Sequence, residues 1–437
     1  MSLLENKRYR KVLVIGQAFH YKSGGGVTIS NLFRGWDKSK LFAIISDRET
    51  TSKDVCNKYY KLNYKERNRK IFWRYVNKDQ NTKINNQLSN GKSSTFKSYL
   101  KKYLLIILTY FGINHLFKKY YFSNQLKNWL LDIGKIDVIY AQYSDFASMK
   151  FAYEMANYLN KPIIIHFMDD WIRSGAVTNV KTAYYESLIS RIFWRIFYRR
   201  LFKKLLKISS ARICISEAMS IEYKKRYKMN FKWVHNYIDL QNWNNRTTSN
   251  SSHEFNISYF GRIGIKNLES FELLCKAVNK IKLIKINILV YTSDSLILSN
   301  LLAKYPFLKM LPYLNQKDYK NAVYSSSALF LPLSFSKKGL KYVKYSMPTK
   351  FPEFLISGVP IILFASEETA VAKFCIKTKS ALVISEKSET ELSKKIKKLI
   401  ESKKMYLSFS KAGISTAKSN FTKRYTQNKF IQIIQNV

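Results

Sequence analysis

Short apolar runs recur along this chain, and segments with the pattern of helices separate one run from the next. In the first half, these runs occupy residues 11–17, 41–46, 136–142, 161–167 and 211–216. Their apolar residues follow one another without alternating polar ones, which is typical of strands buried on both faces. Strands that alternate with helices in this way predict a parallel sheet covered by helices on both sides.

A second series of apolar runs follows residues 241–254 (QNWNNRTTSNSSHE), which have the composition of a linker. These runs occupy residues 255–261, 284–292, 308–314, 327–333, 359–364 and 380–385. Because 437 residues exceed one ordinary core, we predict an α/β protein with two doubly wound, Rossmann-like domains facing each other across a cleft. The predicted domains are residues 1–240 and 255–421, and a last helix at 422–437 can cross back to the first.

The chain carries 75 lysines and arginines against 29 acidic residues, a formal net charge of +46. Such a charge indicates an anionic partner: a nucleic acid, an anionic membrane or a phosphorylated substrate. Part of the excess accompanies a general richness in Lys, Asn, Ile, Tyr and Phe. A basic nucleic-acid-binding protein stays an alternative. We nevertheless expect no nucleic-acid partner, because zinc-ligand spacing, an RNP-like aromatic motif and a basic tail are all missing from the sequence.

The sequence also bears on location and on metals. No apolar run reaches the roughly 18–20 residues of a membrane span. The charged start of the chain leads directly into a strand, without the pattern of a signal peptide. Cys56, Cys214, Cys275 and Cys375 lie far apart and lack metal-ligand spacing. We therefore expect a cytoplasmic protein with reduced thiols and no bound metal.

Two candidate sites lie in the first predicted domain. Gly25 and Gly26 belong to a glycine-rich turn before a helix, where the backbone can approach an anion such as a pyrophosphate. A purely structural turn is the alternative. His166 ends the apolar run at 161–167, a position from which its side chain can face the cleft. Asp169 and Asp170 follow it, but no other His or Cys cluster supports a metal site.

Two further candidates lie in the second predicted domain. Arg262 and Lys266 follow the strand at 255–261, where two cations can clamp a diphosphate leaving group, although solvated charges would look the same. Glu353 lies where a helix begins, before a Ser-Gly-Val-Pro turn and an apolar strand. A carboxylate there can accept hydrogen bonds from ribose hydroxyls, or it can simply stabilise the helix dipole.

Together these segments resemble the GT-B glycosyltransferases of the family 4 type, which are retaining enzymes that use nucleotide sugars. The resemblance rests on the GGG turn, the strand ending in His, ICISEAMSIEYKKRY before HNYID, FGRIGIKN, and the segment ending in SGVPI. It implies that Arg262 and Lys266 hold the donor diphosphate and that Glu353 holds the ribose. It also implies that Gly25 and Gly26 lie near donor and acceptor. His166 would then contact the transferred sugar, and His166, Arg262 and Lys266 would be the catalytic residues.

One position departs from the pattern of that family. A second Glu is common eight residues before the one at 353, and Tyr345 stands there in this chain. Ser346, Thr349 and Lys350 are expected to line the donor site instead. A catalytically inactive GT-B scaffold is therefore a further alternative. With Arg and Lys on the diphosphate no metal is needed, and no pair of carboxylates suggests double displacement. The resemblance to the family therefore implies a front-face retaining mechanism.

Residues 97–131 and 190–208 are unusually basic and aromatic, and the first stretch overlaps a helical insertion at about 52–130 where no strand is expected. Residues 190–208 have apolar side chains near helical spacing with cations between them, which is typical of a helix on a membrane surface. Trp194, Tyr198 and Phe202 would then lie among the headgroups. A helix packed on the sheet with its cations in solvent is the alternative.

These features predict a glycosyltransferase that is peripheral on the inner face of the plasma membrane. Its partners would be a nucleotide-diphosphate sugar as co-substrate, a lipid-linked saccharide acceptor and an anionic membrane surface. No cofactor is expected. The predicted role is the biosynthesis of a bacterial surface polysaccharide of the capsule, O-antigen or lipopolysaccharide type.

Overall fold

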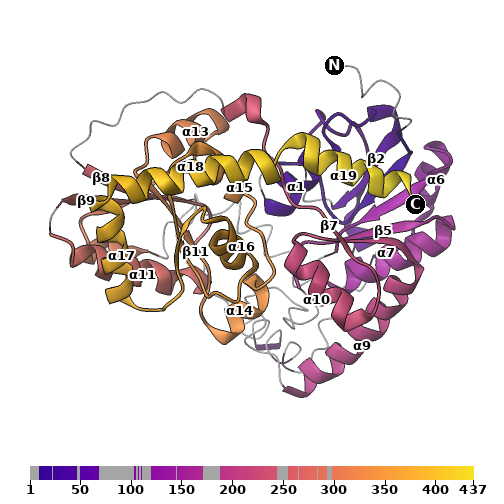
Figure 1. Cartoon of the computed structure of the whole chain (residues 1–437). Helices are drawn as coiled ribbons and strands as arrows, with labels where there is room; N and C mark the ends of the chain where they lie inside the picture. Colours follow the sequence, from indigo (N-terminus) through magenta and orange to yellow (C-terminus); the bar gives the residue numbers. More distant parts are fainter. Residues whose placement is uncertain are drawn as a thin grey trace, which may run out of the picture. The chain divides into compact units, whose positions relative to one another are not determined.

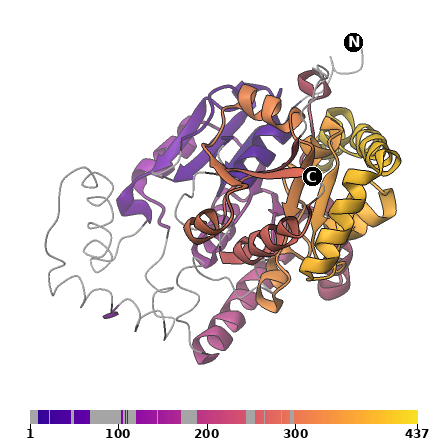
Figure 2. The ribbon, with the colours of Figure 1, turned by 90° about the vertical axis from the view of Figure 1, so that its left-hand side faces the viewer.

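The computed structural model falls into two compact units. It describes residues 9–21, 23–46, 50–67, 103–104, 107, 110, 120–143, 145–170, 188–243, 254–263, 265–282, 284–292 and 298–437; the side chains of 188–195, 265–266, 316 and 338 are outside the description. Unit 1 comprises Met1–Cys214, Asn230–Lys232 and Ile431–Val437, and unit 2 comprises Ile215–Met229 and Trp233–Phe430. Both can be followed by colour in Figure 1 and, after a quarter turn, in Figure 2.

The sheet of unit 1 has the strand order β3-β2-β1-β4-β5-β6-β7. Its strands are β1 (Val12–Ile15), β2 (Leu41–Ser46), β3 (Lys58–Leu62), β4 (Val138–Ala141), β5 (Ile163–Phe167), β6 (Ser209–Cys214) and β7 (Lys232–Trp233). Every pair from β3 to β6 is parallel. The central strands β1, β4 and β5 are buried at every position, which explains their unbroken apolar sequences.

Strand β3 corrects the expectation that no strand occurs between residues 52 and 130. Its sequence, KYYKL, contains no apolar run, and most of its side chains are exposed or half-buried. Among the described strands it lies at the edge of the sheet and pairs only with β2. An edge strand needs less apolar sequence than a central one, so a pattern of buried apolar runs does not reveal it.

Several helices accompany the sheet of unit 1. Those described are α1 (Gly24–Phe33), α2 (Tyr64–Arg67), α6 (Asn124–Asp132), α7 (Phe146–Leu159) and α9 (Leu188–Ile208), with a 3₁₀ turn η1 (Lys38–Lys40). Local sequence explains the ends of α7. Asp145 accepts a hydrogen bond from the backbone of Ser148 in a capping box, and Asn160 ends the helix in the left-handed conformation.

The sheet of unit 2 has the order β10-β9-β8-β11-β12-β13, and its pairs are parallel. Its strands are β8 (Glu254–Phe260), β9 (Lys285–Tyr291), β10 (Leu308–Leu311), β11 (Ala328–Pro332), β12 (Ile361–Phe364) and β13 (Leu382–Ile384). In both units the first six strands thus follow the 3-2-1-4-5-6 order of a Rossmann sheet. The prediction of two doubly wound α/β domains is confirmed.

The helices of unit 2 cover both faces of its sheet. They are α10 (Glu217–Tyr227), α11 (Ile265–Asn279), α12 (Ser299–Lys304), α13 (Gln316–Tyr324), α14 (Lys337–Val343), α15 (Phe351–Ser357), α16 (Ala370–Thr378), α17 (Glu389–Glu401) and α18 (Lys403–Asn420), with a 3₁₀ turn η3 (Leu240–Trp243). Helix α19 (Lys423–Gln435) begins in unit 2 and ends in unit 1. One core cluster packs α11 and α17 on the sheet, and a second packs α13, α15 and α16 on its other side. Helices α15 and α18 lie side by side (Figure 1).

The division into units differs from the sequence-based boundary at residue 240. Helix α10 and the segment from Trp233 onward belong to unit 2. Ile238 pairs with Thr422, and its backbone N–H donates to the carbonyl of Phe421 at 2.9 Å. Conversely, the last seven residues, Ile431–Val437, belong to unit 1. There the Arg10 guanidinium donates to the carbonyl of Gln435 at 2.9 Å.

Helix α9 corrects part of the membrane hypothesis. Tyr198 and Phe202, which were expected among lipid headgroups together with Trp194, are 3% and 1% exposed. The side chain of Trp194 lies outside the described part of the chain. The ring of Phe202 packs 5.6 Å from that of Phe167 on β5, and Tyr198 packs 5.3 Å from Phe146 at the start of α7. These two rings are therefore buried in the core of unit 1, where apolar burial stabilises them, and they do not face lipid headgroups. Most of residues 97–119 lie outside the described part of the chain.

Candidate functional site

Glu353 lies in the first turn of α15, where local sequence sets the start of the helix. Pro352 stands in that first turn, where its missing N–H costs nothing, and Gly358 ends the helix with φ +69°. The apolar side chains Phe351, Phe354 and Leu355 are buried in the core of unit 2. The helix is therefore anchored by its apolar face, which fixes the position of Glu353.

The Glu353 carboxylate is held by a residue from another helix. Tyr319 on α13 donates a hydrogen bond from its hydroxyl to Oε2 of Glu353, at 2.7 Å. Burial raises the pKa of Glu353, while the hydrogen bond from Tyr319 and the charge of Lys350 act in the opposite direction. Burial and the neighbouring Glu353 raise the pKa of Tyr319 well above its ordinary value, so the phenol stays a donor.

Lys350, the residue before α15, lies among aromatic rings. Its Nζ is 4.7 Å from the ring centre of Tyr319, 5.9 Å from that of Phe260 and 6.0 Å from that of Tyr313. These distances are those of cation–π contacts. Burial lowers the pKa of Lys350, and Glu353 partly offsets this. We call Glu353, Lys350, Tyr319, Phe260 and Tyr313 the Glu353 cluster.

The end of β8 connects the Glu353 cluster to Arg262. Phe260 is the last residue of β8, and its ring packs edge-on against Tyr319 at 5.2 Å. Gly261 then adopts φ +150°, a conformation that favours glycine, and Arg262 follows with an exposed side chain. The hydroxyl of Tyr259 donates to the carbonyl of Arg262 at 2.8 Å, which fixes the turn. The side chain of Lys266 lies outside the described part of the chain.

The loop before α15 is anchored by hydrogen bonds to its backbone. The Asn236 amide donates to the carbonyl of Thr349 at 3.0 Å, and Ser216 donates to that of Tyr345 at 2.6 Å. Ser346 donates to a carbonyl within its own segment, that of Tyr342. Ser346, Thr349 and Lys350 were expected to line the donor site. Of these three, only Lys350 is part of the Glu353 cluster defined above.

Tyr345 itself is part of the packing of unit 2. It is 8% exposed, and the guanidinium of Arg226 on α10 lies 5.6 Å from its ring centre. Arg226 also donates to Glu222 at 2.7 Å. The ring at position 345 thus holds α10 beside the loop that leads to Glu353.

In unit 1, Gly25 and Gly26 form the first turn of α1, and Ser23 caps this helix by accepting from the N–H of Gly26. A methyl group added at Gly25 would lie 2.7 Å from Oε1 of Gln17, and one at Gly26 would lie 2.4 Å from the ring of His20. The glycines therefore let polar side chains lie directly against the start of the helix.

His166 belongs to a buried polar network in the same unit. The side chain is 1% exposed, and its Nδ1 lies 2.5 Å from the hydroxyl of Tyr140 on β4. The same hydroxyl also accepts a hydrogen bond from the side-chain amide of Gln142, at 3.3 Å. Oε1 of Gln142 is 3.7 Å from where a side chain on Gly25 would begin. Through Tyr140 and Gln142, the network thus connects His166 to the glycine turn, although the two lie about 140 residues apart in the sequence.

Sequence reasoning missed Tyr319, Tyr140 and Gln142. Gln142 had a usable signal, since it ends an apolar run on the same edge of the sheet as His166. Tyr319 had no such signal, because it lies 34 residues from Glu353 in the sequence and its helix contains no recognised motif. Among the described residues, no group of His, Cys, Asp and Glu side chains could hold a metal ion. In that same part of the chain, every helix is too short or too polar to span a membrane.

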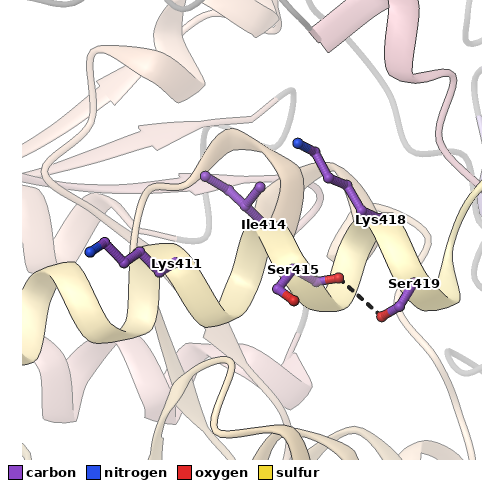
Figure 3. Close-up of a pocket in the computed structure, with 5 residues that line it drawn as sticks. All are labelled: Lys411, Ile414, Ser415, Lys418 and Ser419. Atoms are coloured by element: carbon purple, nitrogen blue, oxygen red, sulfur yellow. Dashed lines mark hydrogen bonds between the residues drawn. The ribbon is translucent and has the colours of Figure 1, made fainter.

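A surface hollow of about 560 Å³ lies on α18, lined by Lys411, Ile414, Ser415, Lys418 and Ser419. Figure 3 shows these side chains on one face of the helix, with Ser419 donating to the carbonyl of Ser415 at 3.0 Å. None of the predicted site residues lines this hollow.

No protein-family model and no curated protein matches this sequence. Solved structures do match over nearly the full length. HepE of Anabaena, solved with UDP and glucose, has a TM-score of 0.61 at 11% identity, covering 98% of this chain and 100% of HepE. A glycosyltransferase of Rickettsia africae has a TM-score of 0.61 at 11% identity, with 99% and 100% coverage.

Sucrose-phosphate synthase of Thermosynechococcus elongatus gives a TM-score of 0.62 at 11% identity, covering 97% of this chain and 98% of the synthase. These neighbours share the architecture of two Rossmann-like domains. The chain therefore has the GT-B fold.

Proposed function

We propose that this chain is a glycosyltransferase that moves a sugar from a nucleotide-diphosphate sugar to a saccharide acceptor. The observation that carries the proposal is the Glu353 cluster: a held carboxylate beside a lysine, next to the turn that presents Arg262. A carboxylate suits the ribose hydroxyls and a guanidinium suits a diphosphate. The neighbours solved with UDP or UDP-glucose support the same substrate class.

In this proposal each candidate residue has one role. Arg262 and Lys266 stabilise the departing diphosphate without a metal, and Glu353 holds the ribose, with Ser346, Thr349 and Lys350 in the surrounding donor site. His166 contacts the transferred sugar, near Gly25 and Gly26. Transfer proceeds with retention by a front-face mechanism. The acceptor is a lipid-linked saccharide of a bacterial capsule, O-antigen or lipopolysaccharide pathway.

A donor screen tests the proposal. Purified protein is incubated with a panel of nucleotide sugars, UDP-sugars first, together with lipid-linked acceptors extracted from membranes. Release of the nucleoside diphosphate is measured with and without EDTA. We expect one donor to be consumed only when acceptor is present, at the same rate in EDTA. If the protein consumes no donor under any of these conditions, the proposal is wrong.

Exchanging Glu353 for glutamine is expected to remove the preference for ribose. A hydrogen bond to a charged group contributes about 1.5–3 kcal/mol, and the lower end of that range means that wild type should bind UDP at least about tenfold more tightly than 2′-deoxy-UDP. In Glu353→Gln the two affinities should differ by no more than about twofold. Titration calorimetry measures both. Glu386→Gln, an exposed glutamate of the same unit, is the matched control and should keep the wild-type ratio.

Helix α9 supports the membrane part of the proposal. Its described outer face carries Arg199, Arg200, Lys203, Lys204 and Lys207, all exposed. Ile196 and Phe197 are 47% and 39% exposed beside them, and α9 contains no acidic residue. An apolar pair flanked by cations is suited to the headgroup region of an anionic leaflet, where a lipid-linked acceptor would also lie.

Removing two of these charges is expected to weaken vesicle binding about 30-fold, because each cation near an anionic surface contributes about 1 kcal/mol. The variant is Lys203→Gln/Lys204→Gln, and co-sedimentation with anionic vesicles is the measurement. Lys394→Gln/Lys398→Gln changes the net charge equally on exposed positions of α17. Equal losses in the two variants would show that net charge acts rather than α9. Tighter, salt-sensitive binding to RNA would favour the nucleic-acid alternative.

A further inference from the structure

Tyr319 contacts two opposite charges at once. Its hydroxyl donates to Oε2 of Glu353 at 2.7 Å, and the face of its ring lies 4.7 Å from Nζ of Lys350. The ring has little freedom to move, because Phe260 packs against it at 5.2 Å and Trp243 at 6.4 Å. Because the hydroxyl of Tyr319 is held firmly, it also fixes the carboxylate of Glu353, which accepts its hydrogen bond.

The helix that carries Tyr319 is itself well anchored. Asn315 caps α13 by accepting from the N–H of Asp318 at 2.9 Å. Val323 of the same helix is fully buried in the cluster that contains Phe354 and Leu355 of α15. Helices α13 and α15 therefore share one core, and the distance between Tyr319 and Glu353 is set by packing rather than by the hydrogen bond alone.

Only one oxygen of Glu353 is engaged. Among the described residues, Oε1 accepts no hydrogen bond, whereas Oε2 accepts from Tyr319. A carboxylate fixed at one oxygen cannot rotate freely, so the other oxygen keeps a constant direction. A fixed acceptor binds a hydroxyl without the entropic cost of ordering a mobile side chain.

We infer that Tyr319 is a positioning residue, which holds Glu353 so that its second oxygen receives a ribose hydroxyl of the donor nucleotide. This rests on the proposed function, in which Glu353 binds the ribose. The inference adds a specific cause for ribose selection: discrimination depends on the phenol hydroxyl of Tyr319 as well as on the carboxylate.

The charges around Glu353 give the inference a pH signature. The groups that face it are Lys350, from the start of its own helix, and Tyr319 from α13, with Tyr313 close to Tyr319. Tyr319 and Lys350 both lower the pKa of Glu353 against the effect of burial. A ribose hydroxyl donates to the ionised carboxylate, so binding weakens as pH falls through that pKa. Without the phenol hydroxyl, the weakening should begin at a higher pH.

The test compares two tyrosines of the same helix. Tyr319→Phe removes the hydroxyl that reaches Glu353, and Tyr324→Phe removes one that donates to the carbonyl of Trp243 at 2.6 Å. Binding of UDP and 2′-deoxy-UDP is measured by calorimetry across a pH series. We expect the roughly tenfold preference for UDP to fall to about two- to threefold in Tyr319→Phe and to persist in Tyr324→Phe. Inorganic pyrophosphate should bind all variants equally.

The outcomes separate this inference from the proposed function. If Glu353→Gln loses the ribose preference and Tyr319→Phe keeps it, the inference is wrong and the proposed function stands. If Tyr324→Phe loses the preference equally, α13 acts by general packing and the inference is also wrong. If wild type binds no nucleoside diphosphate, the proposed function and the inference fail together.

Discussion

Replacing Arg262 with alanine is expected to lower turnover about 100- to 1,000-fold, the usual effect of removing a group that stabilises charge developing in a transition state. The geometry gives the reason. Arg262 follows β8 in a turn fixed by Tyr259, whose hydroxyl also accepts from Asn267 at 3.2 Å. The guanidinium is exposed and forms no ion pair with a described residue, so it is available to a diphosphate.

Steady-state release of nucleoside diphosphate measures this effect. Arg262→Lys should recover part of the activity, because a lysine supplies the charge but not the bidentate hydrogen bonds. Arg424→Ala removes an exposed arginine of α19 and serves as the control. Unchanged turnover in Arg262→Ala would remove Arg262 from the reaction.

Replacing Gly16 with alanine is expected to destabilise unit 1 by about 3 kcal/mol or more. Gly16 follows β1 with φ +90°, and a methyl group there would lie 1.9 Å from the carbonyl oxygen of Gln142. That oxygen belongs to the backbone at the end of β4, where the N–H of Gln142 donates to the carbonyl of Ile15 at 3.0 Å. Relief would require the two central strands to separate.

Gly35 provides the matched control for this substitution. Its φ is +85°, close to that of Gly16, but a methyl group there would meet nothing within 4 Å. Gly35→Ala should therefore lower the free energy of unfolding only by the strain of the left-handed backbone, roughly 1–2 kcal/mol. Thermal unfolding followed by circular dichroism compares the two, with about 2–4 °C expected per kcal/mol for a unit of this size. If both variants lost the same amount of stability, backbone strain rather than the contact with Gln142 would account for the destabilisation in Gly16→Ala.

Buried strands were predictable because their sequences are shaped by burial alone. The run at 161–167 needs no knowledge of its neighbours, and β5 forms there between two other parallel strands. Glu353 was predictable for a similar reason, since the proline and glycine that start and end α15 lie within a few residues of it. Both signals are local in the sequence.

The contacts that orient the site residues could not be predicted, because they join distant segments. Tyr319 and Glu353 meet only because α13 and α15 share a core. Tyr140 and His166 meet because β4 and β5 are adjacent. Helix α9 shows the same limit: its spacing predicted an apolar face, but whether Phe202 meets lipid or the ring of Phe167 depends on the sheet.

The path of the chain between the two units affects how the protein could be divided. Unit 1 takes its last segment, Ile431–Val437, from the far end of the sequence, and Ile433 and Ile434 are buried. A fragment ending at residue 240 would lack that segment and would carry α10, which packs with unit 2. Neither unit is therefore a contiguous, independently excisable module. Attempts to exchange units between chains of this fold should move the segment Ile431–Val437 together with unit 1.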